Sequence, residues 1–295
     1  MTTFKIGNLD ITRVEDFADY GVPLSLVFPA VTDEAIAANR DWLAPNFLNP
    51  ENNTINVHIH SWVIRTQHHT ILVDSCVGHQ KKRHFPPFNM RNSVYLDNLV
   101  AAGVNPNEVD YVFCTHLHSD HVGWNTRLEN GRWVPTFPKA TYLFSRKDYD
   151  SFDPRQPDWP HYSGTDEDTF LDSVLPVVEA GLVEFVDGEH KVGDGLTIVP
   201  TPGHSPGHNA LRIEDSGASG LFTGDSMHHP IQIAEPDLNS FSCWDPTLAR
   251  ASRRKLLDEC CEHHRLLIPG HFAPPHCGRI TRKGDAYRLR PGAAR

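Results

Sequence analysis

The sequence has few cysteines, little basic charge and no long apolar stretch. Its 295 residues include 6 cysteines, which form no C-x-x-C pair, and this scarcity argues against a disulfide framework and against a thiolate zinc site. Lys and Arg together number 27, against 37 Asp and Glu, which gives a formal net charge of −10. Because binding to nucleic acid depends on clustered Lys and Arg side chains, we expect no nucleic-acid partner.

Segments that would place the chain in a membrane or export it are also missing. No apolar run approaches the ~20 residues of a membrane helix. The N-terminus, which begins Met1-Thr2-Thr3-Phe4-Lys5, lacks the basic and apolar segments of a signal peptide. We therefore expect no membrane association and a cytoplasmic location.

Histidine, by contrast, is abundant, with 19 residues in the chain. Its densest cluster is His116-Leu117-His118-Ser119-Asp120-His121, which directly follows a compact apolar segment at 110–114 that predicts a strand. Packing these ligand-type side chains together without a metal is costly, because their polar atoms would compete for too few hydrogen-bond partners. The run therefore predicts a metal site at a strand end, where open α/β sheets usually bind ligands.

Three further residues share this setting. Each follows a β-like run, and each is preceded by a glycine, which lets the backbone turn so that the side chain projects from the strand end. They are His204 in Pro202-Gly203-His204, Asp225 in Thr223-Gly224-Asp225 and His271 in Pro269-Gly270-His271. With the run at 116–121 they form the ordered series H-x-H-x-D-H, G-H, G-D and G-H.

This series resembles the metallo-β-lactamase superfamily, and the resemblance covers about residues 55–271. It implies an α/β (α+β) fold, the αββα sandwich in which two mixed β-sheets are flanked by helices. It also implies one domain over residues 1–295, with an N-terminal extension at about 1–54. A stretch rich in Pro and acidic residues predicts an inserted loop or lid at about 151–181.

The resemblance also implies a pair of metal ions held by seven side chains. Carried over position by position, His116, His118 and His204 would hold the first ion. Asp120, His121 and His271 would hold the second, and Asp225 would bridge the two. Nitrogen and oxygen ligands without a thiolate suit two divalent ions, with zinc as the first expectation and iron, manganese or cobalt as alternatives.

Departures from individual branches of the superfamily narrow the expected activity. Flavodiiron enzymes carry Glu where this chain has His118, true zinc β-lactamases lack the bridging Asp225, and glyoxalase II enzymes add a helical domain where only a short stretch follows His271. The chain then looks like the group that contains N-acyl homoserine lactonases, pyridoxolactonase-type enzymes and methyl parathion hydrolase. Residues before Ile55 resemble the extension that these enzymes place near the active-site mouth or a dimer contact, so a homodimer is possible.

We therefore expect a dinuclear metal-dependent hydrolase that opens a small lactone or cleaves a carboxylic ester through a metal-bridging hydroxide. Asp120 is predicted to help protonate the leaving oxygen. His228 stands where homoserine lactonases have Tyr, and it is predicted to donate a hydrogen bond to the substrate carbonyl. The alternatives are a phosphotriesterase like methyl parathion hydrolase and an iron enzyme of the persulfide dioxygenase type.

Other residues carry weaker expectations. His208 is predicted to support the site without binding metal, and Asp74 either supports a metal-binding histidine or caps a strand end. His84 is expected at the surface or in packing. Helices are predicted over 93–102, capped by Asn92, and from Pro246 to about His263. Aromatic residues in loop-like stretches either line an apolar pocket or pack in the core: Phe85, Phe88, Trp124, Trp133, Trp159 and Tyr162.

Overall fold

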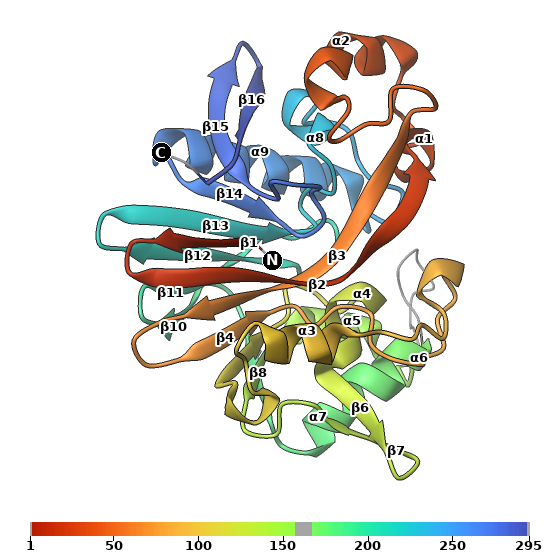
Figure 1. Cartoon of the computed structure of the whole chain (residues 1–295), viewed down its shortest axis with the longest axis vertical. Helices are drawn as coiled ribbons and strands as arrows, with labels where there is room; N and C mark the ends of the chain where they lie inside the picture. The colour runs from red at the N-terminus through yellow and green to blue at the C-terminus, as the bar shows by residue number, and fades with distance from the viewer. Residues whose placement is uncertain (1, 157–166, 294–295) are drawn as a thin grey trace.

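Two large β-sheets form the centre of the computed structural model in Figure 1, which describes residues 2–156 and 167–293. Within these residues the first sheet has seven strands in the order β1-β2-β3-β4-β5-β8-β9. They are β1 (Thr2–Ile6), β2 (Leu9–Pro23), β3 (Thr54–Arg65), β4 (Thr70–Val73), β5 (Tyr111–Phe113), β8 (Thr141–Ser145) and β9 (Val183–Val186).

The second sheet follows the chain in sequence order from β10 to β16. Its strands are β10 (His190–Gly193), β11 (Leu196–Pro200), β12 (Asn209–Asp215), β13 (Ala218–Gly224), β14 (Leu266–Pro269), β15 (Gly278–Lys283) and β16 (Ala286–Pro291). A separate hairpin consists of β6 (Thr126–Glu129) and β7 (Arg132–Pro135). Both large sheets are mixed, because β4, β5, β8 and β9 run parallel and β13 is parallel to β14, whereas their other neighbours are antiparallel.

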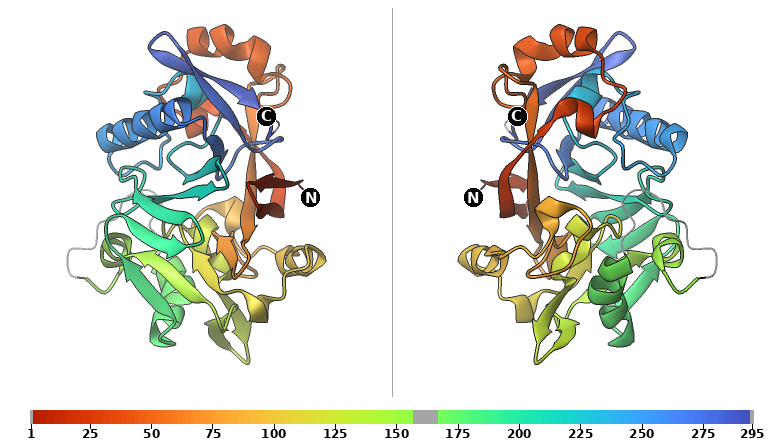
Figure 2. Two further views of the ribbon diagram at one scale, coloured as in Figure 1. Left: turned by 90° about the vertical axis from the view of Figure 1, so that its left-hand side faces the viewer. Right: turned by 90° about the vertical axis from the view of Figure 1, so that its right-hand side faces the viewer.

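Helices cover the outer faces of the two sheets, as Figure 2 shows for α9 (blue) on one side. The longer ones are α2 (Asp33–Leu43), α3 (Tyr95–Ala101), α5 (Arg146–Phe152) and α9 (Pro246–Glu262). Leu99 of α3 packs with Leu72 and Val112 of the first sheet. Leu256 of α9 packs with Leu221 of the second.

A third apolar cluster, which includes Ile64, Phe113, Phe222 and Ile268, fills the space between the two sheets. Burial of these side chains removes apolar surface from water on both faces of each sheet, and this is the main driving force for stacking the layers. The layers therefore run helix, sheet, sheet, helix, and the predicted αββα sandwich is confirmed.

Strands β2 and β3 form a long twisted ribbon that continues beyond the first sheet toward α1 (Leu24–Val27) and α2 (Figure 1). The ribbon is bent by register shifts between Glu15 and Phe17 and between Phe17 and Tyr20, as expected where extra residues interrupt antiparallel pairing. The bend carries the end of β2 to the side of the sandwich where the functional residues gather.

Two helix predictions had different outcomes. Helix α9 begins behind Asp245, whose carboxylate accepts hydrogen bonds from the backbone N–H of Thr247 and Leu248, as predicted. The prediction of an Asn92 cap is wrong, because α3 begins at Tyr95 and the Asn92 side chain accepts a hydrogen bond from Gln80 instead. Ser93 Oγ accepts the Tyr95 N–H in its place.

All six cysteines are free thiols, and four of them are buried. Among the described residues, no helix is long and apolar enough to cross a membrane.

Candidate functional site

The predicted metal-binding residues gather at one end of the sandwich, from four segments that each follow a strand. His116 to His121 follow β5 of the first sheet, and Asp120 and His121 lie in the short helix α4 (Ser119–Val122). His204 follows β11, Asp225 follows β13 and His271 follows β14, all in the second sheet. Apart from Asp120, which is partly exposed, these side chains are buried.

Three of the histidines direct ring nitrogens at one another. His118 Nδ1 lies 2.9 Å from His116 Nε2 and 2.9 Å from His204 Nε2, and the latter two nitrogens are 3.1 Å apart. A tetrahedral ion with metal–nitrogen bonds of about 2.0–2.1 Å holds its ligands roughly 3.3 Å apart. The three nitrogens are therefore spaced to share one metal ion.

A second group lies beside the first and shares Asp225 with it. The ligand atoms of Asp120, His121 and His271 are within 4.8 Å of one another. Asp225 Oδ1 lies 3.0 Å from His271 Nε2, while Asp225 Oδ2 lies 3.4 Å from both His121 Nε2 and His204 Nε2. One carboxylate thus contacts both groups, which is the arrangement of a bridging ligand.

Whether this cluster fits metal ions can be judged from its buried polar atoms that lack hydrogen-bond partners. Within the described residues, His121 Nε2 is a buried nitrogen that has no hydrogen-bond partner, although it faces the carboxylates of Asp120 and Asp225 at 3.7 and 3.4 Å. Buried polar groups are rarely left in this state, and an ion is one of the usual reasons. The donor set of histidine nitrogens and carboxylate oxygens suits a pair of divalent ions.

The two groups differ in their affinity for protons. Burial lowers the pKa of His118 to about 4, and burial also lowers the pKa values of His116 and His204. Burial alone would also lower the pKa values of His121 and His271, but the Asp225 carboxylate beside them raises both. These shifts favour the neutral, metal-binding form of the histidines in the first group, and metal binding to the second group competes with protons.

Asp225 is held in its charged form by the same contacts. Burial would raise the pKa of its carboxyl group, but His271, His121 and His228 around it lower that pKa well below the usual range. A charged, buried carboxylate needs compensation by cations. Two metal ions would provide it once the neighbouring histidines have lost their protons.

Groups behind the cluster orient its rings. Asp74 Oδ2 lies 2.9 Å from His121 Nδ1, and the Asp74 carboxylate also accepts hydrogen bonds from the Thr115 N–H and hydroxyl. His208 Nε2 accepts the Asp225 N–H at 3.1 Å. His208 thus makes the contact expected of a supporting residue, and Asp74 makes both kinds of contact predicted for it, one to a histidine of the cluster and one to the backbone after a strand.

Asp148, which sequence analysis missed, ties two of the metal-site segments together. This fully buried carboxylate on α5 accepts hydrogen bonds from Ser205 Oγ at 2.8 Å, from the Gly207 N–H and from the Leu117 N–H. Leu117 lies between His116 and His118, and Ser205 follows His204. Burial raises the pKa of Asp148 to about 7, although its three donors favour the charged form.

We expect Asp148→Ala to weaken zinc binding about tenfold, the lower end of the range for groups that orient metal ligands. The substitution leaves buried donors unpaired on both segments, so the ligand nitrogens lose their fixed spacing. Competition with a chromophoric chelator measures the affinity. Asp150→Ala removes an exposed carboxylate from the same helix and should leave it unchanged; equal affinities for the two variants would refute the positioning role.

A largely apolar pocket of about 460 Å³ opens onto the cluster. Val22, Leu26 and Val27 from the end of β2 and from α1 line one side, and Phe85 and Phe88 line another. Asp120, Asp225 and His271 lie at its polar end. No lysine or arginine is among the lining residues that the structure describes, so the pocket suits a neutral apolar molecule.

The aromatic candidates divide between the pocket and the core. Phe85 and Phe88 line the pocket, whereas Trp124 is buried with its indole N–H donated to Ser93 Oγ. Trp133 lies under the Lys81 ammonium, 4.0 Å from the ring centre. Trp159 and Tyr162 fall outside the described residues. His84 was expected at the surface or in packing; it is exposed, but it also lines the pocket.

His228 lies where the pocket meets the cluster. Its Nε2 is 3.2 Å from Asp225 Oδ2 and 3.5 Å from Ser240 Oγ. Its backbone N–H is donated to Gln232 Oε1 at 2.7 Å, which fixes the turn. His204, Asp225 and His228 also form a group with metal-binding spacing, so the ring is placed to contact either a substrate or an ion.

Comparisons with known proteins agree with this geometry. The model of the metallo-beta-lactamase superfamily matches residues 55–271. An N-acyl homoserine lactonase of Bacillus thuringiensis is 24% identical over 230 residues, which cover 74% of this chain and 82% of the relative. The N-acyl homoserine lactonase AttM of Rhizobium radiobacter is 30% identical over 184 residues, which cover 60% of this chain and 63% of the relative.

Solved structures share the fold over nearly the whole chain. AidC, a dizinc quorum-quenching lactonase in complex with the product of its reaction, has a TM-score of 0.80 at 19% identity, covering 100% of this chain and 98% of that one. The hydrolase AbOPH of the beta lactamase superfamily also has a TM-score of 0.80, at 22% identity, covering 99% and 97%.

Proposed function

The chain belongs to the metallo-beta-lactamase superfamily, and from this premise we propose that it is a dinuclear metal-dependent hydrolase of lactones and related carboxylic esters. The observation that carries the proposal is the pair of ligand groups that meet at Asp225, at the polar end of an apolar pocket. The N-acyl homoserine lactonases among its relatives support a lactone as the substrate.

We assign the first ion to His116, His118 and His204, the second to Asp120, His121 and His271, and the bridging position to Asp225. Zinc is the proposed metal, because the set contains histidine and carboxylate ligands only. Bound ions of this kind supply Lewis acidity toward a carbonyl oxygen and lower the pKa of water from 15.7 to about 7.

The protein's own groups then have separate tasks. The pocket orients the ester so that its carbonyl carbon faces Asp225. His228 Nε2 donates a hydrogen bond to the carbonyl oxygen, where negative charge develops during attack by water. Asp120, partly exposed and 3.5 Å from His271 Nε2 through Oδ2, accepts a proton from the attacking water and returns it to the leaving oxygen. In a lactone this opens the ring to a hydroxy acid.

A substrate panel tests the proposal. Zinc-loaded protein is assayed with N-acyl homoserine lactones, unsubstituted lactones, aryl esters and a paraoxon-type phosphotriester. We expect the highest kcat/KM for a lactone, because the pocket accepts a neutral apolar group beside the ions. Faster turnover of the phosphotriester, or oxygen uptake with a thiol persulfide in place of hydrolysis, would overturn the assignment.

A further inference from the structure

Part of the pocket wall is formed by the loop between β4 and α3, whose tip folds back toward the pocket. The loop closes on itself through backbone hydrogen bonds from Gln80 N to Arg91 O and from Met90 N to Lys81 O, at 2.7 and 2.8 Å. Its tip contains the short helix η1 (Pro86–Phe88), and it presents Phe85 and Phe88 to the pocket with their ring centres 4.8 Å apart. We call residues 80–91 the pocket loop.

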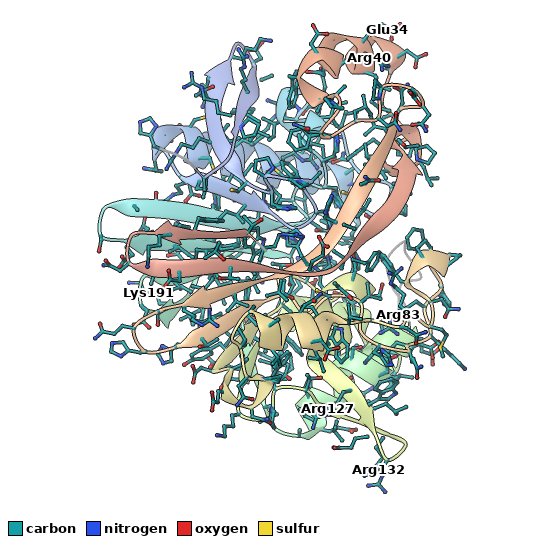
Figure 3. The ribbon with its side chains drawn as sticks, viewed as in Figure 1. Glu34, Arg40, Arg83, Arg127, Arg132 and Lys191 are labelled. Atoms are coloured by element: carbon teal, nitrogen blue, oxygen red, sulfur yellow. The ribbon has the colours of Figure 1, made fainter. Side chains whose placement is uncertain are left out.

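Charged side chains are buried at the base of the pocket loop. Lys81 and Arg83 are 1% and 5% exposed, and Asp172, from a distant part of the chain, is 8% exposed. Arg83 holds both carboxylate oxygens of Asp172, with Nη1 2.8 Å from Oδ2 and Nη2 3.0 Å from Oδ1. In Figure 3, Arg83 is labelled on the side that carries the loop, whereas Arg132 lies exposed at the tip of the β6–β7 hairpin.

Lys81 completes this cluster. Its Nζ is 3.2 Å from Asp172 Oδ1, 2.8 Å from Ser173 Oγ and 2.6 Å from Thr126 Oγ1. Lys81 and Arg83 therefore share one buried carboxylate, and burial lowers the pKa of Lys81 to about 7 although Asp172 beside it favours the charged form. Removal of Asp172 would leave the Arg83 guanidinium buried without its carboxylate and would take an acceptor from Lys81, which is far more costly than loss of an exposed ion pair.

Asp172 belongs to an unusual element. It lies in the π-helical turn η4 (Phe170–Val174), between α6 (Glu167–Thr169) and α7 (Leu175–Glu179). Such turns are rare and occur often at functional sites. Val174 and Val177, from this element and from α7, are fully buried in the apolar cluster on the outer face of the first sheet. Asp172 thus joins the pocket loop to a buried part of the core.

We propose that Asp172 is a positioning residue for substrate selection. Acting through Arg83 and Lys81, it holds the pocket loop so that Phe85 and Phe88 contact the apolar substituent of the substrate. The enzyme then favours lactones or esters with a long apolar substituent over unsubstituted ones. This inference depends on the proposed hydrolase function, and it adds the residue that maintains the pocket wall.

The test compares Asp172→Asn with Glu167→Gln in the zinc-loaded full chain. Glu167 is exposed on the neighbouring α6, so its variant removes the same charge without touching the cluster. We expect Asp172→Asn to raise KM for a long-chain N-acyl homoserine lactone about tenfold. Its kcat, its zinc content and its KM for an unsubstituted γ-lactone should stay within about twofold of wild type. Glu167→Gln should leave all of these values unchanged.

Hydrogen–deuterium exchange supplies a readout that does not need activity. In Asp172→Asn, amides of residues 80–91 should exchange faster than in wild type and in Glu167→Gln. If Asp172→Asn does not fold, Arg83→Lys replaces it, because a lysine keeps the charge but cannot hold both oxygens. If the wild-type chain hydrolyses no lactone or ester, the proposed function is wrong. Faster amide exchange of the pocket loop in Asp172→Asn would still show that Asp172 holds the loop. Unchanged chain-length preference in a folded, active variant would overturn the inference.

Discussion

Asp225→Ala is expected to lower kcat/KM for the best lactone on the order of a thousandfold. Metal-ion catalysis contributes several kcal/mol of transition-state stabilisation, and about 4 kcal/mol corresponds to a factor near 1000. Asp225 is the one carboxylate in the described cluster that contacts histidines of both groups. Without it, the positive charge of two ions would be compensated mainly by Asp120, so we expect the variant to retain about one zinc per chain.

Steady-state kinetics and metal analysis of the same preparation check this prediction. Asp187→Ala serves as the control, because it removes an exposed aspartate that follows β9 in the first sheet and should leave both values unchanged. An Asp225→Ala protein that keeps two zinc ions and full activity would contradict the bridging assignment.

The second large effect concerns His228. We expect His228→Phe to lower kcat for a lactone about a hundredfold, the lower end of the range for loss of one donor to a developing oxyanion. KM and zinc content should change little, because the phenyl ring fills similar space and the proposed ligands are intact. His228→Tyr should recover most of the activity, since a phenol can donate the same hydrogen bond.

The pair of variants separates two roles for His228. Its Nε2 lies near Asp225 and His204 in a group with metal-binding spacing, so a ligand role predicts zinc loss in both variants. A donor role predicts full zinc content in both and activity in His228→Tyr alone. Kinetics together with zinc analysis of the purified variants therefore decide between the roles.

The metal-binding residues could be predicted from the sequence because they are adjacent in the chain or share one local sequence context. His116, His118, Asp120 and His121 occupy six consecutive positions, so their proximity needs no knowledge of the fold. His204, Asp225 and His271 each follow a glycine at a strand end, and this repeated context marks them although they are far apart in the chain. The structure brings all seven side chains into one cluster.

Residues that act through long-range contacts gave no such signal. Asp148 meets Ser205 across 57 positions, and Lys81 meets Asp172 across 91. Neither aspartate belongs to a motif, and an acidic residue in a polar segment is most often solvated. The start of α3 was misplaced for a related reason, because Ser93, two residues before the helix, donates its hydroxyl to Asp16 from the first sheet while it accepts the Tyr95 N–H. The roles of these residues depend on contacts with residues far away in the chain, and a single sequence does not show which distant residues come into contact.

The central claim is that two metal ions make this protein a lactone hydrolase, and a metal titration tests it most directly. The chain is freed of metal with a chelator and then titrated with Zn²⁺ while hydrolysis of an N-acyl homoserine lactone is followed by proton release. We predict negligible turnover without metal and full turnover at two equivalents per chain. Full turnover by the metal-free protein, or none at two bound equivalents with any lactone or ester, would contradict the account.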